Sequence, residues 1–360
     1  MGNAMQIIDR NAPWSMREHP FLPVANPAYF YGPAELKEVI QGIWSTVDRG
    51  LGMGILFGDA GSGKSMLCRK VAATALAEPD RYRVAVIGDT QSGWNGLDLV
   101  ERVSRQFGLP PAGSRESSLD RLYDFLGTLP ETCRAVLLID DAHLLVRRGA
   151  FEALRILCRF ELPTHKPLTL LCFARPGWME ALRAAPEYMD LAAWTSRIPL
   201  LSRESIGEIV AWRMKTAGVI NRQGPAQFQE DAIVAVHAWS KGLIRPALHA
   251  CRLAFDFAIS RNRPLIDGSV VVEALAKDPR FDSDARENIA MVLLQLDREK
   301  TTRKRIQEPL HPIPPTKPLA PSAVTPTLPE EETRENGSSR DRRAAELLLK
   351  ASERRKMKGE

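Results

Sequence analysis

One eight-residue string constrains the fold of this chain more than any other feature. The string matches the pattern GxxxxGK[ST] at every fixed position. It consists of Gly58, Asp59, Ala60, Gly61, Ser62, Gly63, Lys64 and Ser65. An apolar run over 55–57 precedes the string, and a helical pattern over 64–77 follows it. In such a turn from a buried strand into a helix, successive backbone N–H groups face an anion. The sequence therefore predicts a phosphate-binding loop.

The side chains of this loop indicate which ligand it binds. Gly61 and Gly63 lack a Cβ that would block the backbone N–H groups from a phosphate. Lys64 is expected to reach the β- and γ-phosphates of a nucleotide, and the Ser65 hydroxyl is expected to bind Mg²⁺. We therefore expect ATP and Mg²⁺ as cofactors.

A second motif ends an apolar run over 135–139 with two carboxylates, Asp140 and Asp141. Ligands of open α/β sheets bind at the carboxyl ends of the strands, so Asp140 is expected to support Mg²⁺ there. Asp141 is the candidate that orients or deprotonates an attacking water. In the alternative, Asp141 only caps the short helix that contains His143.

Strand and helix patterns alternate over the first 200 residues. Short apolar strands are expected at 55–57, 84–87, 135–139 and 168–173. Helices are expected at 35–47, 64–77, 97–107, 119–126 and 151–160. Wholly apolar strands that alternate with helices are typical of a parallel sheet covered on both faces. This predicts an α/β P-loop NTPase core.

From about Ser202 the strand patterns stop. Helices are expected at 202–217, 230–240, 245–260, 267–277 and from about 280 to 300, which predicts a small helical bundle. Residues 306–340 contain eight prolines and are expected to be disordered. A short basic helical pattern over 341–358 is either a docking peptide for a protein partner or a solubilising tail. We divide the chain into an N-terminal segment (1–34), an ATPase core (35–200), a helical lid (201–300) and a tail (301–360).

Three arginines are candidates for contact with the γ-phosphate. Arg245 begins a helix of the bundle and could couple nucleotide state to the lid, or it could be a solvated helix-end arginine. Arg175 follows the strand over 168–173 and either senses phosphate or forms a surface ion pair. Arg197 lies between core and bundle and could reach the nucleotide of a neighbouring subunit, or it has no catalytic role.

Composition and charge limit which partners the protein can bind and in which cellular compartment it is expected. Residues 301–360 carry 13 Lys and Arg against 9 Asp and Glu, whereas the other 300 residues carry 36 against 35. The net charge of these 300 residues is close to zero and therefore does not indicate nucleic-acid binding. A local basic patch that binds DNA is compatible with this net charge. The N-terminus has no signal-peptide pattern and no apolar run is long enough to span a bilayer. Five cysteines without a CxxC pair indicate reduced thiols in a cytoplasmic protein.

The order of these segments resembles the AAA+ ATPases of the ExeA/GspA type. The resemblance covers about 20–277 and includes the loop over 58–65 and the segments 138–143, 174–178, 197–201 and 240–246. It implies an AAA+ fold, ATP hydrolysis and ATP-dependent self-association. This chain departs from the family pattern at positions that are expected to take part in ATP hydrolysis. Asp141 replaces the usual Glu, and Ala-Arg-Pro-Gly-Trp at 174–178 replaces the usual Gly-Gln-Pro-Glu-Leu.

Three roles follow from the resemblance. The first is an assembly or remodelling ATPase of a secretion or envelope apparatus, although secretion members generally add a membrane span that this chain does not show. The second is a DNA-binding regulator of transposition, because the same fold is similar to ATPases of the TniB/TnsC/MuB kind. The third is a nucleotide-gated scaffold that does not hydrolyse ATP.

Overall fold

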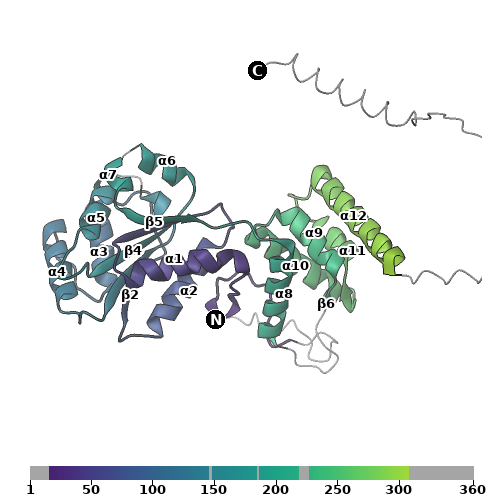
Figure 1. The fold of residues 1–360 in the computed structure, drawn as a ribbon, viewed down its shortest axis with the longest axis horizontal. Helices are drawn as coiled ribbons and strands as arrows, with labels where there is room; N and C mark the ends of the chain where they lie inside the picture. The colour runs from purple at the N-terminus through teal and green to yellow at the C-terminus, as the bar shows by residue number, and fades with distance from the viewer. Residues whose placement is uncertain (1–15, 146–147, 185, 219–226, 308–360) are drawn as a thin grey trace, which may run out of the picture. The chain divides into compact units, whose positions relative to one another are not determined.

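Five parallel strands form one sheet within the residues that this computed structural model describes, which are 16–145, 148–184, 186–218 and 227–307. The strands are β1 (Met53–Phe57), β2 (Tyr82–Ile87), β3 (Arg134–Ile139), β4 (Leu168–Ala174) and β5 (Ala192–Arg197). Their order across the sheet is β2-β3-β4-β1-β5, and every pair is parallel. Figure 1 shows this sheet with helices around it.

Helices cover both faces of the sheet, as predicted. The helices are α1 (Lys37–Asp48), α2 (Lys64–Leu76), α3 (Gly96–Gln106), α4 (Arg115–Gly127) and α5 (Arg148–Cys158). Successive strand residues point to opposite faces, so Leu56 packs in the cluster of α1 and α2, whereas Ile55 packs in the cluster of α3, α4 and α5. The predicted α/β P-loop fold with a doubly covered parallel sheet is therefore confirmed.

The edge strand β5 was not predicted from the sequence, and neither were the short helices α6 (Gly177–Arg183) and α7 (Pro186–Met189). β5 pairs with β1 on one side, and its side chains alternate between half-buried and exposed. It therefore lacks the continuous apolar run that marks the inner strands. The expectation that strands stop near Ser202 was also wrong. β6 (Gln227–Phe228) and β7 (Leu265–Ile266) form a parallel pair that is too short to leave a periodic pattern.

A helical part follows the sheet and has a core of its own. It consists of α8 (Arg203–Ala217), α9 (Glu230–Ser240), α10 (Ile244–Ser260), α11 (Gly268–Leu275) and α12 (Ser283–Gln307). Three residues of the N-terminal segment, Met16, Phe21 and Tyr29, are buried in this same core. The described part of the predicted 1–34 segment, which begins at Met16, thus packs with the helical part. None of the described helices combines the length and the apolar composition needed to cross a membrane. The expected disordered tail lies almost wholly outside the described residues.

Glu35 links the start of the sheet domain to the first helix of the helical part. Its carboxylate accepts hydrogen bonds from the Ser202 backbone N–H (2.9 Å) and from the Ser205 hydroxyl (2.6 Å). Burial alone would raise the pKa of Glu35, but these hydrogen bonds outweigh it and lower the pKa to about 2. The carboxylate therefore stays ionised and fixes the N-terminus of α8.

Candidate nucleotide site

The predicted phosphate loop connects the end of β1 to the start of α2. Gly61 and Gly63 have φ angles of +89° and +102°, which glycine adopts without strain. A Cβ on Gly58 would lie 2.4 Å from the Ser62 hydroxyl oxygen, and one on Gly61 would lie 3.2 Å from the Arg245 Cβ. The backbone therefore forms a cradle at the phosphate loop. A side chain at these glycines would either occupy the cradle or strain the backbone.

Lys64 and Ser62 supply the polar lining of this cradle. The Lys64 ammonium donates to the carbonyls of Gly58 (2.7 Å) and Asp59 (2.9 Å), so the charge is held at the loop. Burial lowers the pKa of Lys64, whereas the carboxylates of Asp141 and Asp140 raise it and the cations of Arg175 and Arg245 lower it. Within the described residues the buried Ser62 hydroxyl has no hydrogen-bond partner. An orphaned donor in a cationic cradle fits a phosphate oxygen.

Asp140 lies at the carboxyl end of β3, as predicted. It is 9% exposed, and one of its carboxylate oxygens accepts a hydrogen bond from the Asp141 N–H (3.0 Å). Its carbonyl accepts from the Thr90 hydroxyl at 2.6 Å. The sequence analysis did not identify Thr90. Its position three residues after β2, at the carboxyl edge of the sheet, could have indicated that it lies near Asp140. With Ser65, Asp140 fits the two protein ligands of a Mg²⁺ ion that is otherwise bound by phosphates and water.

Asp141 lies next to Asp140 in a left-handed backbone conformation, with φ of +50°. It precedes the short 3₁₀ helix Ala142–Leu144, but among the described residues its side chain accepts no capping hydrogen bond. The capping alternative therefore lacks the bond that defines a cap. The carboxylate is about half exposed and lies near His143.

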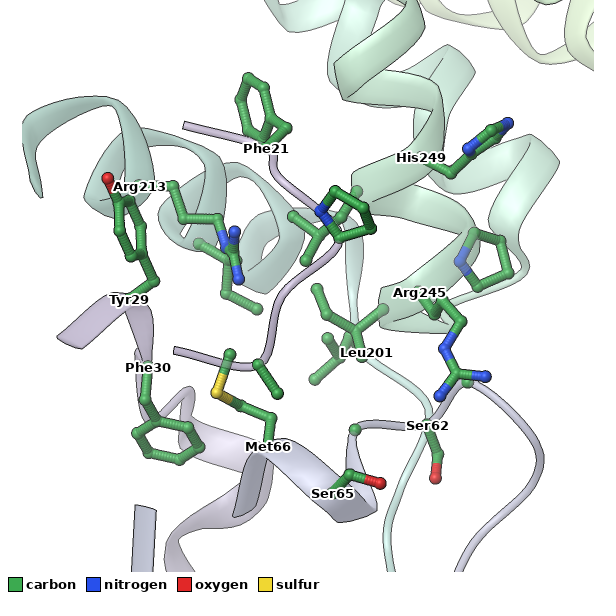
Figure 2. A pocket seen from close by; sticks show the side chains of 18 of the residues that line it. Phe21, Tyr29, Phe30, Ser62, Ser65, Met66, Leu201, Arg213, Arg245 and His249 are labelled. Carbon is green, nitrogen blue, oxygen red and sulfur yellow. The ribbon is translucent and has the colours of Figure 1, made fainter. Parts of the chain in front are cut away.

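Arg245 reaches the phosphate loop from the helical part. Its backbone N–H donates to the Gly61 carbonyl at 2.9 Å, and Figure 2 shows its guanidinium directed toward Ser62. Arg175 follows β4 directly, and its charge acts on both Lys64 and His143. The structure thus brings Arg245 and Arg175 to the loop region, and their catalytic roles stay predictions.

A cavity of about 540 Å³ extends from the loop between the N-terminal segment and the helices α8 and α10. Much of its wall is apolar and comes from Phe30, Met66, Leu201, Ile209, Ile244 and Leu248. Sequence reasoning missed this role of the N-terminal segment. Part of that segment is held by Arg213, which donates to the Pro20 carbonyl at 3.0 Å. An apolar cavity beside an anion cradle fits the base and the phosphates of one nucleotide.

A parallel sheet with strand order β2-β3-β4-β1-β5, a phosphate loop after β1 and paired carboxylates after β3 define an AAA+ P-loop NTPase. The AAA domain family matches residues 47–182. The chain is similar to general secretion pathway protein A of Aeromonas hydrophila, with 27% identity over 271 residues. That match covers 72% of this chain and 47% of the relative, so the chain spans about half of the relative's length. The chain therefore contains an AAA domain and resembles AAA+ ATPases of the ExeA/GspA type.

Solved structures share the fold. The Aeropyrum pernix ORC2 protein has a TM-score of 0.54 and 18% identity, over 70% of this chain and 71% of that one. Cdc6p from Pyrobaculum aerophilum has a TM-score of 0.54 and 17% identity, over 72% and 70%. At these identities the likeness concerns architecture alone.

Proposed function

We propose that the protein binds ATP with Mg²⁺, hydrolyses it, and uses the nucleotide state as an assembly or remodelling switch. One observation carries the proposal. The Arg245 N–H of the helical part binds the Gly61 carbonyl of the phosphate loop at 2.9 Å. A ligand in this loop therefore contacts the sheet domain and lies beside the first turn of α10. A nucleotide can change the angle between the two domains only if its contacts differ between the two arrangements. A ligand at this position can make such contacts with both domains.

Each residue of the site has a role in this proposal. The loop N–H groups and Lys64 bind the phosphates, and Ser65 and Asp140 hold Mg²⁺, which when bound neutralises phosphate charge. Asp141 orients the attacking water as a general base. Arg175 and Arg245 stabilise negative charge on the phosphoryl group.

Self-association completes the proposal. The Arg197 side chain is 68% exposed, and its guanidinium forms an ion pair with Asp59 in the phosphate loop of its own chain. An exposed ion pair contributes little, about 0–1 kcal/mol, so the guanidinium is free to exchange partners. We propose that it acts on the nucleotide of a neighbouring copy, and that the tail over 301–360 binds a protein partner. By analogy with the secretion-pathway relative, that partner belongs to a secretion apparatus.

The alternatives are a DNA-binding regulator of transposition and a scaffold that binds ATP without turnover. One experiment separates all three. Release of inorganic phosphate, particle mass, and binding of a fluorescent DNA duplex are measured with and without ATP at two salt concentrations. Turnover with ATP-dependent growth in mass supports the switch. ATP-dependent DNA binding that weakens with salt favours the regulator, because bound cations replace counterions on DNA. Binding of ATP without phosphate release favours the scaffold.

A further inference from the structure

His143 lies against the carboxylate that the proposed hydrolysis assigns to water activation. Its Nδ1 is 3.8 Å from an Asp141 carboxylate oxygen, and its side chain is 14% exposed. In the described part of the chain, the buried Nδ1 atom has no hydrogen-bond partner. Buried polar atoms are nearly always paired, so this atom points to a partner within reach.

Asp141 is the partner that the geometry offers. Its carboxylate makes no capping bond within the described residues, and its side chain is 47% exposed and able to turn. A shift of about 1 Å would bring the two atoms to ordinary hydrogen-bond distance. His143 follows Asp141 by two residues around the short 3₁₀ helix Ala142–Leu144, so the helix itself keeps the two side chains together.

The surroundings of His143 favour a neutral ring. Burial lowers the pKa of His143, and the cations of Arg175 and Lys64 lower it further, whereas Asp141 and Asp140 act in the opposite direction. A neutral imidazole carries one N–H, and its position decides whether Nδ1 donates or accepts. Only a ring protonated on Nδ1 can donate to the Asp141 carboxylate.

We propose that His143 is a positioning residue, whose Nδ1–H donates to the Asp141 carboxylate and fixes the orientation of that carboxylate toward the attacking water. Asp is one methylene shorter than Glu, so the direction of its carboxylate decides whether it reaches the water. A hydrogen bond to that carboxylate would fix its direction and so compensate for the shorter side chain. This inference rests on the proposed hydrolysis, because it assigns a helper to the same carboxylate.

Kinetics of paired variants test the proposal in the full-length protein. His143→Leu removes the donor at similar volume, and His143→Asn places an amide donor near the position of Nδ1. We expect His143→Leu to lower kcat about tenfold while the KM for ATP changes less than about twofold. His143→Asn should keep most of the activity. In an Asp141→Asn background His143→Leu should have no further effect. His165→Leu, at the opposite end of the sheet before β4, is the control. The proposal would be overturned if His143→Leu and His143→Asn lowered kcat equally. It would also be overturned if the losses of kcat in His143→Leu and Asp141→Asn multiplied in the double variant.

A spectroscopic measurement decides the pairing independently of turnover. Spectra of ¹⁵N-histidine protein without nucleotide are expected to show His143 protonated on Nδ1, with a shift that changes in Asp141→Asn. The His143→Asn spectrum assigns the signal among the six histidines. A ring protonated on Nε2, or no response to Asp141→Asn, would overturn the proposal. If the wild-type protein hydrolyses no ATP, the proposed function fails, and these spectra still decide whether the two residues pair.

Discussion

The Arg197 guanidinium lies 2.9 Å from the Asp59 carboxylate, so the last residue of the edge strand β5 contacts the phosphate loop of its own chain. The two residues are 138 positions apart in sequence. The contact places an exposed cation at the rim of the phosphate loop. The proposed action of Arg197 on the nucleotide of a neighbouring copy starts from this position.

Mixing two inactive variants tests whether Arg197 acts across a subunit interface. Arg197→Ala keeps an intact phosphate loop, and Lys64→Ala keeps an intact Arg197. We expect the mixture to recover part of the ATP turnover that each variant lacks alone, because Lys64→Ala subunits offer Arg197 to their neighbours. Co-assembled mixtures that remain inactive would assign Arg197 to its own chain. Full activity of Arg197→Ala alone would exclude any role in turnover.

Lys64→Ala should weaken ATP binding at least about 100-fold, because the variant loses a charge-assisted bond to phosphate. Calorimetric titration with ATP measures the affinity, and circular dichroism checks that the fold is intact. Lys70→Ala on the same helix α2 is the control and should bind as the wild type does. Unchanged affinity in Lys64→Ala would refute the proposed site.

Asp141→Asn should bind ATP with Mg²⁺ at wild-type affinity and hydrolyse it about 100-fold more slowly, because an amide cannot accept the proton of the water. Single-turnover phosphate release measures the chemical step. Wild-type turnover in this variant would place the base elsewhere and leave Asp141 without a catalytic role.

Glu35→Gln should destabilise the protein by about 1–2 kcal/mol at neutral pH, because the charged acceptor of two hydrogen bonds is lost. The pKa of Glu35 is lowered from 4.5 to about 2 on folding. The stabilisation is therefore complete above about pH 4.5 and disappears as the pH falls toward about 2. Urea unfolding of both proteins at several pH values measures the difference. The exposed Glu38→Gln on α1 is the control, and a difference independent of pH would contradict the assignment.

Truncation after Gln307 should leave ATP affinity unchanged, because the described residues that line the cavity all lie between Phe21 and Arg280. The expected disorder of 306–340 is tested by amide exchange, which should be fast throughout this stretch. Loss of ATP binding on truncation would show that the tail contributes to the site.

The sequence determined the phosphate loop, Asp140, Asp141 and the inner strands β3 and β4. Each of these features is contiguous, and each has a local cause. The glycines permit a backbone that other residues strain, and strands buried on both faces must be apolar along their whole length. Apart from the short α6 and α7, the helices were predicted for the same reason, since their apolar spacing lies within one segment.

Only the tertiary structure decided which distant residues meet at the site. The contacts Arg197–Asp59, Thr90–Asp140 and Arg245–Gly61 join elements that no local pattern relates. The edge strand β5 exists because β1 offers it a row of backbone hydrogen bonds, whereas its own polar residues would fit a loop equally well. Likewise, Arg213 acquires its place at the cavity because α8 packs against the N-terminal segment. Short-range periodicity does not predict these contacts, because they depend on how the whole chain packs.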